Sequence, residues 1–132
     1  MHTRYLMMSS AIFMALLGLA TSFFPIEVLS MHGTAPDNAT LLLVQMMGAL
    51  YLGFAILNWM ARGILIGGIY ARPVALGNLL HFGMVGMMLS KAAIAHGAVQ
   101  LAASALVFSI FAIWFGVVSF RSPVAAPQAG NQ

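Results

Sequence analysis

Apolar residues run in four long stretches along the chain, and each stretch is long enough to cross a bilayer as an α-helix. The stretches extend from about Tyr5 to Phe24, from Leu41 to Ala61, from Pro73 to Ile94 and from Ala98 to Phe120. A helix that crosses the hydrocarbon core needs about 20 mostly apolar residues. The pattern therefore predicts an all-α fold, a polytopic membrane protein with a bundle of four transmembrane helices.

Residues at the ends of the stretches support these limits. Pro25 ends the first stretch, and Arg62 follows the second. Pro73 begins the third stretch, in the first helical turn, where a backbone N–H has no partner within the helix and proline can therefore be accommodated. We expect one transmembrane domain over residues 1–121. The tail 122–132 is rich in Pro, Ala, Gly and Gln and is expected to be a disordered cytoplasmic segment.

The first stretch has a second interpretation, as a cleaved signal peptide. Met1 to Arg4 would be its basic region, and Gly18 and Ala20 would precede the cleavage site. A transmembrane helix is the better interpretation, because the stretch is long for a signal peptide and three more apolar stretches follow it directly.

The composition requires lipid as the solvent for most of the surface. Of 132 residues, 62 % are hydrophobic and only 5 % are charged, whereas about a quarter of the residues in soluble domains are charged. The chain has no cysteine, which excludes disulfides, thiol catalysis and thiolate metal sites. Its basic residues are scattered, so no nucleic-acid partner is expected.

The basic residues also predict an orientation. Arg4, Arg62, Arg72 and Arg121 fall on one side of the membrane in the four-helix scheme, and only Lys91 falls on the other. Lys and Arg flanking transmembrane helices concentrate in the cytoplasm. Both termini are therefore expected there, in a bacterial plasma membrane.

The two longer connections differ in character. Segment 25–40 contains no Lys or Arg and holds both acidic residues of the chain, Glu27 and Asp37, so we expect it to be an outer loop. Segment 63–70 is apolar, interrupted by glycine and too short to cross, so it is expected to lie in the cytoplasmic membrane interface.

Small residues recur at helical spacing in three of the four stretches, and close backbone approach through such residues drives helix association in lipid. The stripes are expected either to pack the monomer or to receive a second subunit. Phe115 is expected on another face of the last helix. The predicted packing residues are Ala102, Ala105, Ser109, Ala112, Gly116 and Ser119 in the last stretch, Gly83 and Gly86 in the third, and Ala15 and Gly18 in the first.

Few polar side chains interrupt the apolar stretches, and polar groups in hydrocarbon are candidates for function. Asn58 and Asn78 lie at matching depth in the second and third helices, and His81 lies one turn deeper than Asn78. With Tyr51, which shares a face with Asn58, they predict either a hydrogen-bond cluster that fixes helix register or the lining of a small ligand pocket open to the cytoplasm.

Two motifs resemble those of small, uncharacterised four-span bacterial membrane proteins. The second helix ends in Leu57-Asn58-Trp59-Met60-Ala61-Arg62, and the third opens with Gly77-Asn78 followed by His81. The resemblance implies four transmembrane helices and a bacterial plasma membrane. It implies no activity, so no functional residue is transferred from it.

These observations leave two functional hypotheses. The first is a non-enzymatic accessory or scaffold subunit, which associates as a homo-oligomer or with another membrane protein. The alternative is a binder or carrier of a small, mostly apolar ligand at Asn58, Asn78, His81 and Tyr51. No catalytic residues, metal site or cofactor are expected, because the sequence shows no nucleophile–base arrangement, no acid pair and no metal-ligand spacing.

Overall fold

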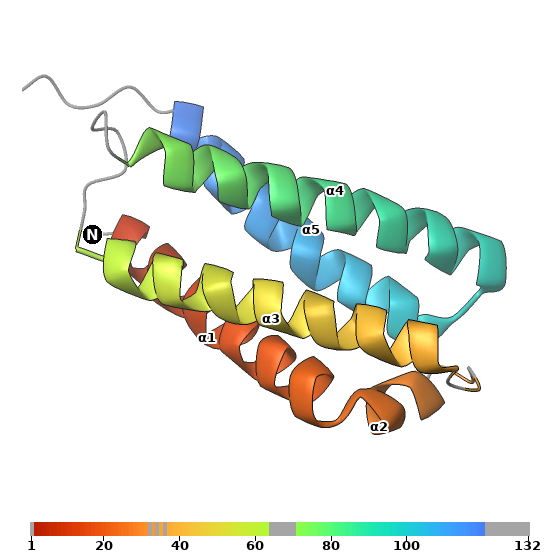
Figure 1. Cartoon of the computed structure of the whole chain (residues 1–132). Helices are drawn as coiled ribbons and strands as arrows, with labels where there is room; N and C mark the ends of the chain where they lie inside the picture. The colour runs from red at the N-terminus through yellow and green to blue at the C-terminus, as the bar shows by residue number, and fades with distance from the viewer. Residues whose placement is uncertain (1, 32, 34, 36, 64–70, 121–132) are drawn as a thin grey trace, which may run out of the picture. The chain divides into compact units, whose positions relative to one another are not determined.

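The structure, a computed structural model, describes residues 2–31, 33, 35, 37–63 and 71–120. All regular elements in these ranges are helices, and they follow one another as shown in Figure 1. They are α1 (His2–Phe23), α2 (Pro25–Ser30), α3 (Asn38–Ala61), α4 (Arg72–His96) and α5 (Val99–Phe120).

The predicted all-α class with four long apolar helices is confirmed. α1, α3, α4 and α5 are long and apolar enough to cross a membrane, and they mark the chain as a membrane protein. Their ends lie within three residues of the predicted ones. The expectations for segment 64–70 and for the tail 122–132 lie outside the described residues.

The helices form two compact units that divide after Gly63. The first unit is a hairpin in which α1 and α3 run side by side and α2 lies in their connection; the second is a hairpin of α4 and α5 (Figure 1). Each hairpin is a packing unit with its own close contacts.

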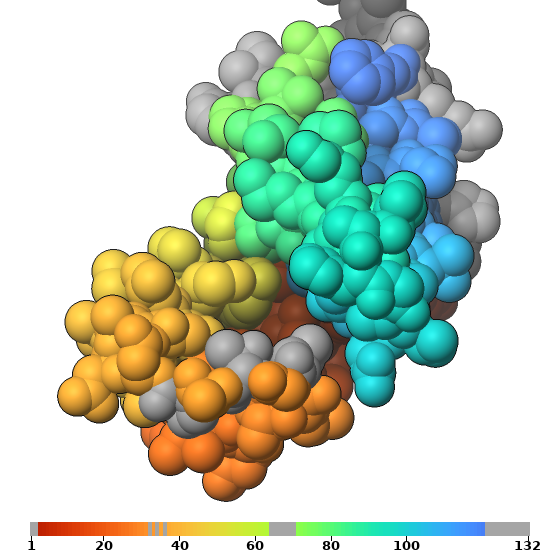
Figure 2. All heavy atoms as spheres, turned by 90° about the vertical axis from the view of Figure 1, so that its right-hand side faces the viewer, coloured from red at the N-terminus to blue at the C-terminus, as the bar shows by residue number. Residues whose placement is uncertain are grey.

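Proline and aspartate shape the connection of the first hairpin. Pro25 is buried and occupies the first turn of α2, so the segment that was expected to be a loop holds a short helix. Figure 2 shows α2 (orange) at the end of the hairpin where α3 begins. Asp37 caps α3, since its carboxylate accepts a hydrogen bond from the Thr40 N–H at 2.9 Å. Thr40 lowers the pKa of Asp37, mainly through a hydrogen bond from its side chain and then through this bond from its backbone, because both favour the charged carboxylate.

Two glycines let α1 and α3 approach closely. A Cβ added at Gly18 would lie 2.7 Å from Leu52 Cγ and 2.9 Å from the Leu52 backbone nitrogen. A Cβ added at Gly48 would lie 2.8 Å from the Ser22 backbone nitrogen. No side chain larger than hydrogen fits at either point unless a neighbour moves. The two contacts also fix the antiparallel register of the pair.

The second hairpin turns within two residues. Gly97 adopts a left-handed conformation with φ 64°, and its N–H donates to the Ala93 carbonyl at 2.8 Å. Glycine adopts this conformation without strain because it has no Cβ. α5 then begins at Val99, so α4 and α5 are tightly coupled neighbours.

Aromatic rings fill the interior of the second hairpin. Phe82 and Phe115 are both fully buried, with ring centroids 5.7 Å apart and an interplanar angle of 15°. Phe82 also lies 4.9 Å from the Phe111 ring and 5.5 Å from that of Phe108. The expectation that Phe115 lies away from the packed face of the last helix was therefore wrong. Small residues bring the backbones together, and rings on the same side fill the space beside the contact.

Candidate functional site

Asn58 ties the two long helices of the first hairpin together. Its side chain is fully buried, and its Nδ2–H donates to Ser10 Oγ at 3.1 Å. The Ser10 hydroxyl in turn donates to the Met7 carbonyl at 3.1 Å. Ser10 is also fully buried, so this chain of hydrogen bonds links α3 to the backbone of α1 away from solvent.

Tyr51 lies in the same hairpin, seven residues before Asn58 on one side of α3. Only 6 % of Tyr51 is exposed. The face of α3 that carries Tyr51, Ala55 and Asn58 is accordingly buried, and its polar side chains belong to the interior.

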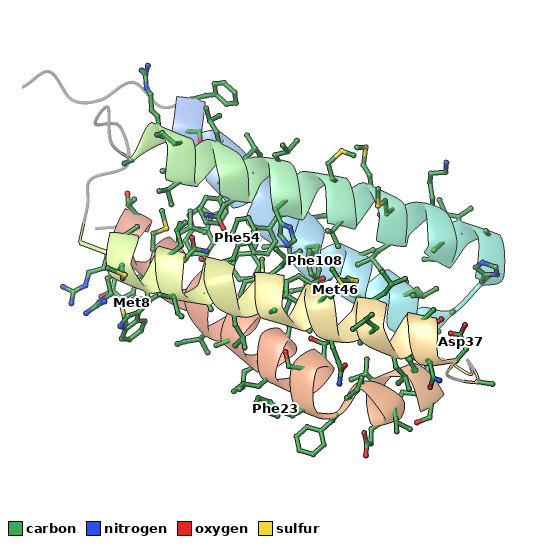
Figure 3. All side chains as sticks on the ribbon, in the orientation of Figure 1. Met8, Phe23, Asp37, Met46, Phe54 and Phe108 are labelled. Atoms are coloured by element: carbon green, nitrogen blue, oxygen red, sulfur yellow. The ribbon has the colours of Figure 1, made fainter. Side chains whose placement is uncertain are left out.

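Asn78 and His81 lie on α4. Asn78 is fully buried and donates from Nδ2 to the Val74 carbonyl, one turn earlier, at 2.9 Å. The His81 ring lies 5.6 Å from the Phe82 ring and 6.2 Å from the Phe108 ring on α5. Figure 3 shows Phe108 among the side chains of this hairpin. That Asn58, Asn78, His81 and Tyr51 join in one ligand-binding cluster stays a prediction.

An apolar groove runs along the first hairpin between α1 and α3. Its volume is about 270 Å³. Its buried floor includes Ala11 and Ala55, which are 3 % and 6 % exposed, whereas Ile12 and Ile56 project with 53 % and 63 % exposed. The complete lining is Ala11, Ile12, Ala15, Leu52, Ala55, Ile56 and Trp59. Small side chains in the floor leave the space between larger ones open.

A second groove, of about 300 Å³, lies between α4 and α5. Its edges are exposed at Ile94 and Leu106, while Ala105 in its floor is buried. Five of its seven lining residues are small, and Ala102, Ala105 and Ser109 among them belong to the predicted stripe of the last helix; the other two are Ser90 and Ala93. The groove is therefore a shallow channel with a floor of small and hydroxyl side chains.

The remaining residues of the stripes divide between packed and open positions. On α5, Ser109, Ala112, Gly116 and Ser119 are half-buried and Ala102 is exposed. A Cβ at Gly116 would lie 3.6 Å from Leu79 Cδ1, an ordinary contact. The stripe thus continues past the groove along the contact with α4.

The glycines of α4 differ from one another, as do the small residues of α1. A Cβ at Gly86 would lie 3.2 Å from Ser109 Oγ and 3.4 Å from the Ser109 nitrogen, whereas Gly83 has open space. Gly86 therefore lies at the crossing with α5 and Gly83 does not. On α1, Gly18 lies at the crossing with α3, and Ala15 lines the apolar groove.

Sequence reasoning missed two residues that organise the first hairpin, Ser10 and Gly48. Serine was not counted among the polar residues of the apolar stretches, because its hydroxyl commonly bonds to the backbone of its own helix. Gly48 carries a usable signal: it precedes Ala55 by seven residues, so both lie on one face of α3.

Among the described residues no group of three or more His, Asp or Glu is close enough to hold a metal ion. Comparison of the chain with protein-family models, with curated proteins and with solved structures gave no match. The two grooves are candidate surfaces within the described part of the chain.

Proposed function

We propose that this chain is a non-enzymatic membrane subunit that binds a partner helix in the groove between α4 and α5. The partner is a second copy of the chain or another membrane protein. The observation that carries the proposal is that this groove stays open at the surface after α4 and α5 have packed against each other.

Small residues in lipid support this function. Without a hydrophobic drive between helices, association depends on close backbone approach over small residues and on hydroxyl hydrogen bonds. Ala93, Ala102 and Ala105 supply the first, and Ser90 and Ser109 bring hydroxyls to the lining. Ser90 donates to the Gly86 carbonyl at 2.8 Å, which holds its side chain close to the helix and keeps the groove clear.

Two neighbouring alanines give a matched test. Ala102 lines the groove and Ala103 does not, and both are exposed on α5. Ala102→Leu should lower the fraction of tagged chain that leaves native membranes in a complex, as measured by native mass spectrometry in mild detergent. Ala103→Leu should leave that fraction unchanged. Equal effects of the two variants, or a wild-type chain that is always monomeric, would refute the proposal.

The proposed setting is a bacterial plasma membrane, as the resemblance of the Asn58 and Asn78 motifs implies, with both termini in the cytoplasm. Basic residues flanking the helices support this orientation. Ser30 is exposed on α2. In intact cells Ser30→Cys should react with a membrane-impermeant thiol reagent and Gln128→Cys should not. Labelling of both cysteines from outside would reverse the assignment of the C-terminus.

A further inference from the structure

The apolar groove of the first hairpin ends beside two arginines. Arg62 follows α3 directly, and helical backbone angles continue through it, with φ −60° and ψ −22°. It comes seven residues after Ala55 in the groove floor, so both lie on the same face of the helix. Its guanidinium lies 4.3 Å from the ring centroid of Trp59, which lines the groove.

Arg4 reaches the same end from α1. It is exposed and comes seven residues before Ala11, which is also in the groove floor. The contacts of Gly18 with Leu52 and of Gly48 with Ser22 set the antiparallel register. In this register Arg62 on α3 lies level with the position four residues after Arg4 on α1, which is one helical turn away. One turn corresponds to an offset of about 6 Å along the helix axis.

The charges of this hairpin are separated along its length. The described acidic residues, Glu27 and Asp37, lie in α2 and at the start of α3. Figure 3 shows Met8 and Asp37 at opposite ends of the hairpin. Arg4 comes one turn before Met8 on α1, and Arg62 follows the end of α3 that lies opposite Asp37. The two arginines are therefore remote from both acids, at a position where a helix that spans the membrane enters the headgroup region.

We propose that the first hairpin binds one phospholipid with an anionic headgroup, whose phosphate lies at Arg4 and Arg62 and whose acyl chain occupies the apolar groove. A guanidinium presents a planar set of donors that matches phosphate. From Trp59 back to Leu52 the groove follows α3 for about 10 Å, at 1.5 Å per residue. The site is separate from the groove of the proposed subunit role and does not depend on it.

Charge favours a lipid over a second copy of the chain in this groove. Copies in one membrane share an orientation, so two hairpins facing each other here would bring their Arg4 and Arg62 side chains to the same level. Like charges across such an interface repel. An anionic headgroup instead neutralises both arginines, while its acyl chain fills the space that Ala11, Ala15 and Ala55 leave open.

The chain offers a direct optical test, because it has two tryptophans and only Trp59 lines this groove. The full chain with Trp114→Phe is placed in phosphatidylcholine vesicles that contain a minor fraction of brominated lipid. Brominated phosphatidylglycerol should quench Trp59 more than brominated phosphatidylcholine at equal mole fraction. One basic residue near a membrane surface changes affinity for anionic lipid by about fivefold, so Arg62→Gln should reduce the preference by about that factor.

Controls separate the headgroup contact from the groove. Lys91→Gln removes one positive charge from the second hairpin and should leave the preference intact. Ala55→Leu fills the groove and should bring quenching by phosphatidylglycerol down to that by phosphatidylcholine; far-UV circular dichroism checks that this variant folds. Should it not fold, Arg4→Gln and Arg62→Gln decide the outcome alone.

Three results would overturn the lipid site. The first is equal quenching by the two brominated lipids in the Trp114→Phe chain. The second is a preference that survives Arg4→Gln and Arg62→Gln together. The third comes from chemical crosslinking of the chain in the same vesicles. A crosslinked dimer that Ala55→Leu abolishes, together with no lipid preference, would assign the groove to a second copy. None of these results bears on the Ala102 test of the subunit role.

Discussion

Gly48→Ala tests the close contact of the first hairpin most simply. A Cβ at Gly48 would lie 2.7 Å from Thr21 Oγ1 and 2.8 Å from the Ser22 backbone nitrogen, whereas ordinary contacts begin near 3.4 Å. The backbone of α1 must therefore retreat by about 0.6 Å, and overpacking of this kind costs about 1–3 kcal/mol. Replacement of glycine by alanine in a helix stabilises the helix by about 1 kcal/mol. The free energy of unfolding should therefore fall by between zero and about 2 kcal/mol.

Gly53→Ala on the same helix is the matched control, because a Cβ at Gly53 meets nothing within 4 Å. It should gain helix stability without overpacking. The free energies of unfolding of the two variants should differ by about 1–3 kcal/mol, measured by titration of mixed micelles with a denaturing detergent. Gly86→Ala and Gly83→Ala repeat the comparison on α4. Equal unfolding free energies for Gly48→Ala and Gly53→Ala would refute the close contact.

The other predictions concern single side chains. Ser10→Ala and Asn58→Leu should show a coupling energy of about 0.6–1.7 kcal/mol in a double-mutant cycle, the range for hydrogen bonds between helices in membranes; strict additivity would contradict the Asn58–Ser10 bond. Phe115→Ala should lower the free energy of unfolding by about 3–5 kcal/mol because it empties a fully buried position, and Phe120→Ala, at a side chain that is 78 % exposed, should change it little. Asp37→Ala should lower the melting temperature at neutral pH. The difference from wild type should shrink as pH falls through the lowered pKa of Asp37, because protonation removes the stabilisation by the charged cap. A difference in melting temperature that is constant with pH would exclude the charged cap.

The positions of the four long helices could be predicted from sequence because bilayer thickness sets their length and composition. Pro25 and Arg62 mark element limits directly, and the short connection through Gly97 follows from the nearness of two apolar stretches. These signals are local and do not depend on what the helices pack against.

Helix rotation could not be predicted in the same way. In a soluble protein the polar side of a helix reveals the buried side, but helices that are apolar all round lack this signal. Phe115 shows the consequence: the small residues of α5 were taken to define the packed face, and the adjacent ring proved fully buried. Close approach at Ser109 and ring packing at Phe115 belong to one contact surface.

The candidate site was predicted only in part. Asn58 and Asn78 were expected to be buried because amides are costly in lipid, and both are. The partner of Asn58 within the first hairpin, Ser10, was not anticipated, because a serine in a helix can satisfy its hydroxyl on its own backbone. The open groove of the second hairpin depends on how far apart α4 and α5 lie near their connection, which a residue pattern does not specify.

The central claim, that a partner helix occupies the groove between α4 and α5, is tested most directly by site-specific photocrosslinking in native membranes. A photoreactive phenylalanine derivative takes the place of Leu106, a large exposed residue at the edge of the groove, in one strain and of Ala103 in another. We expect a discrete crosslinked protein band from position 106, of one mass in repeated experiments, and only diffuse lipid adducts from position 103. Lipid adducts alone from both positions would contradict the claim.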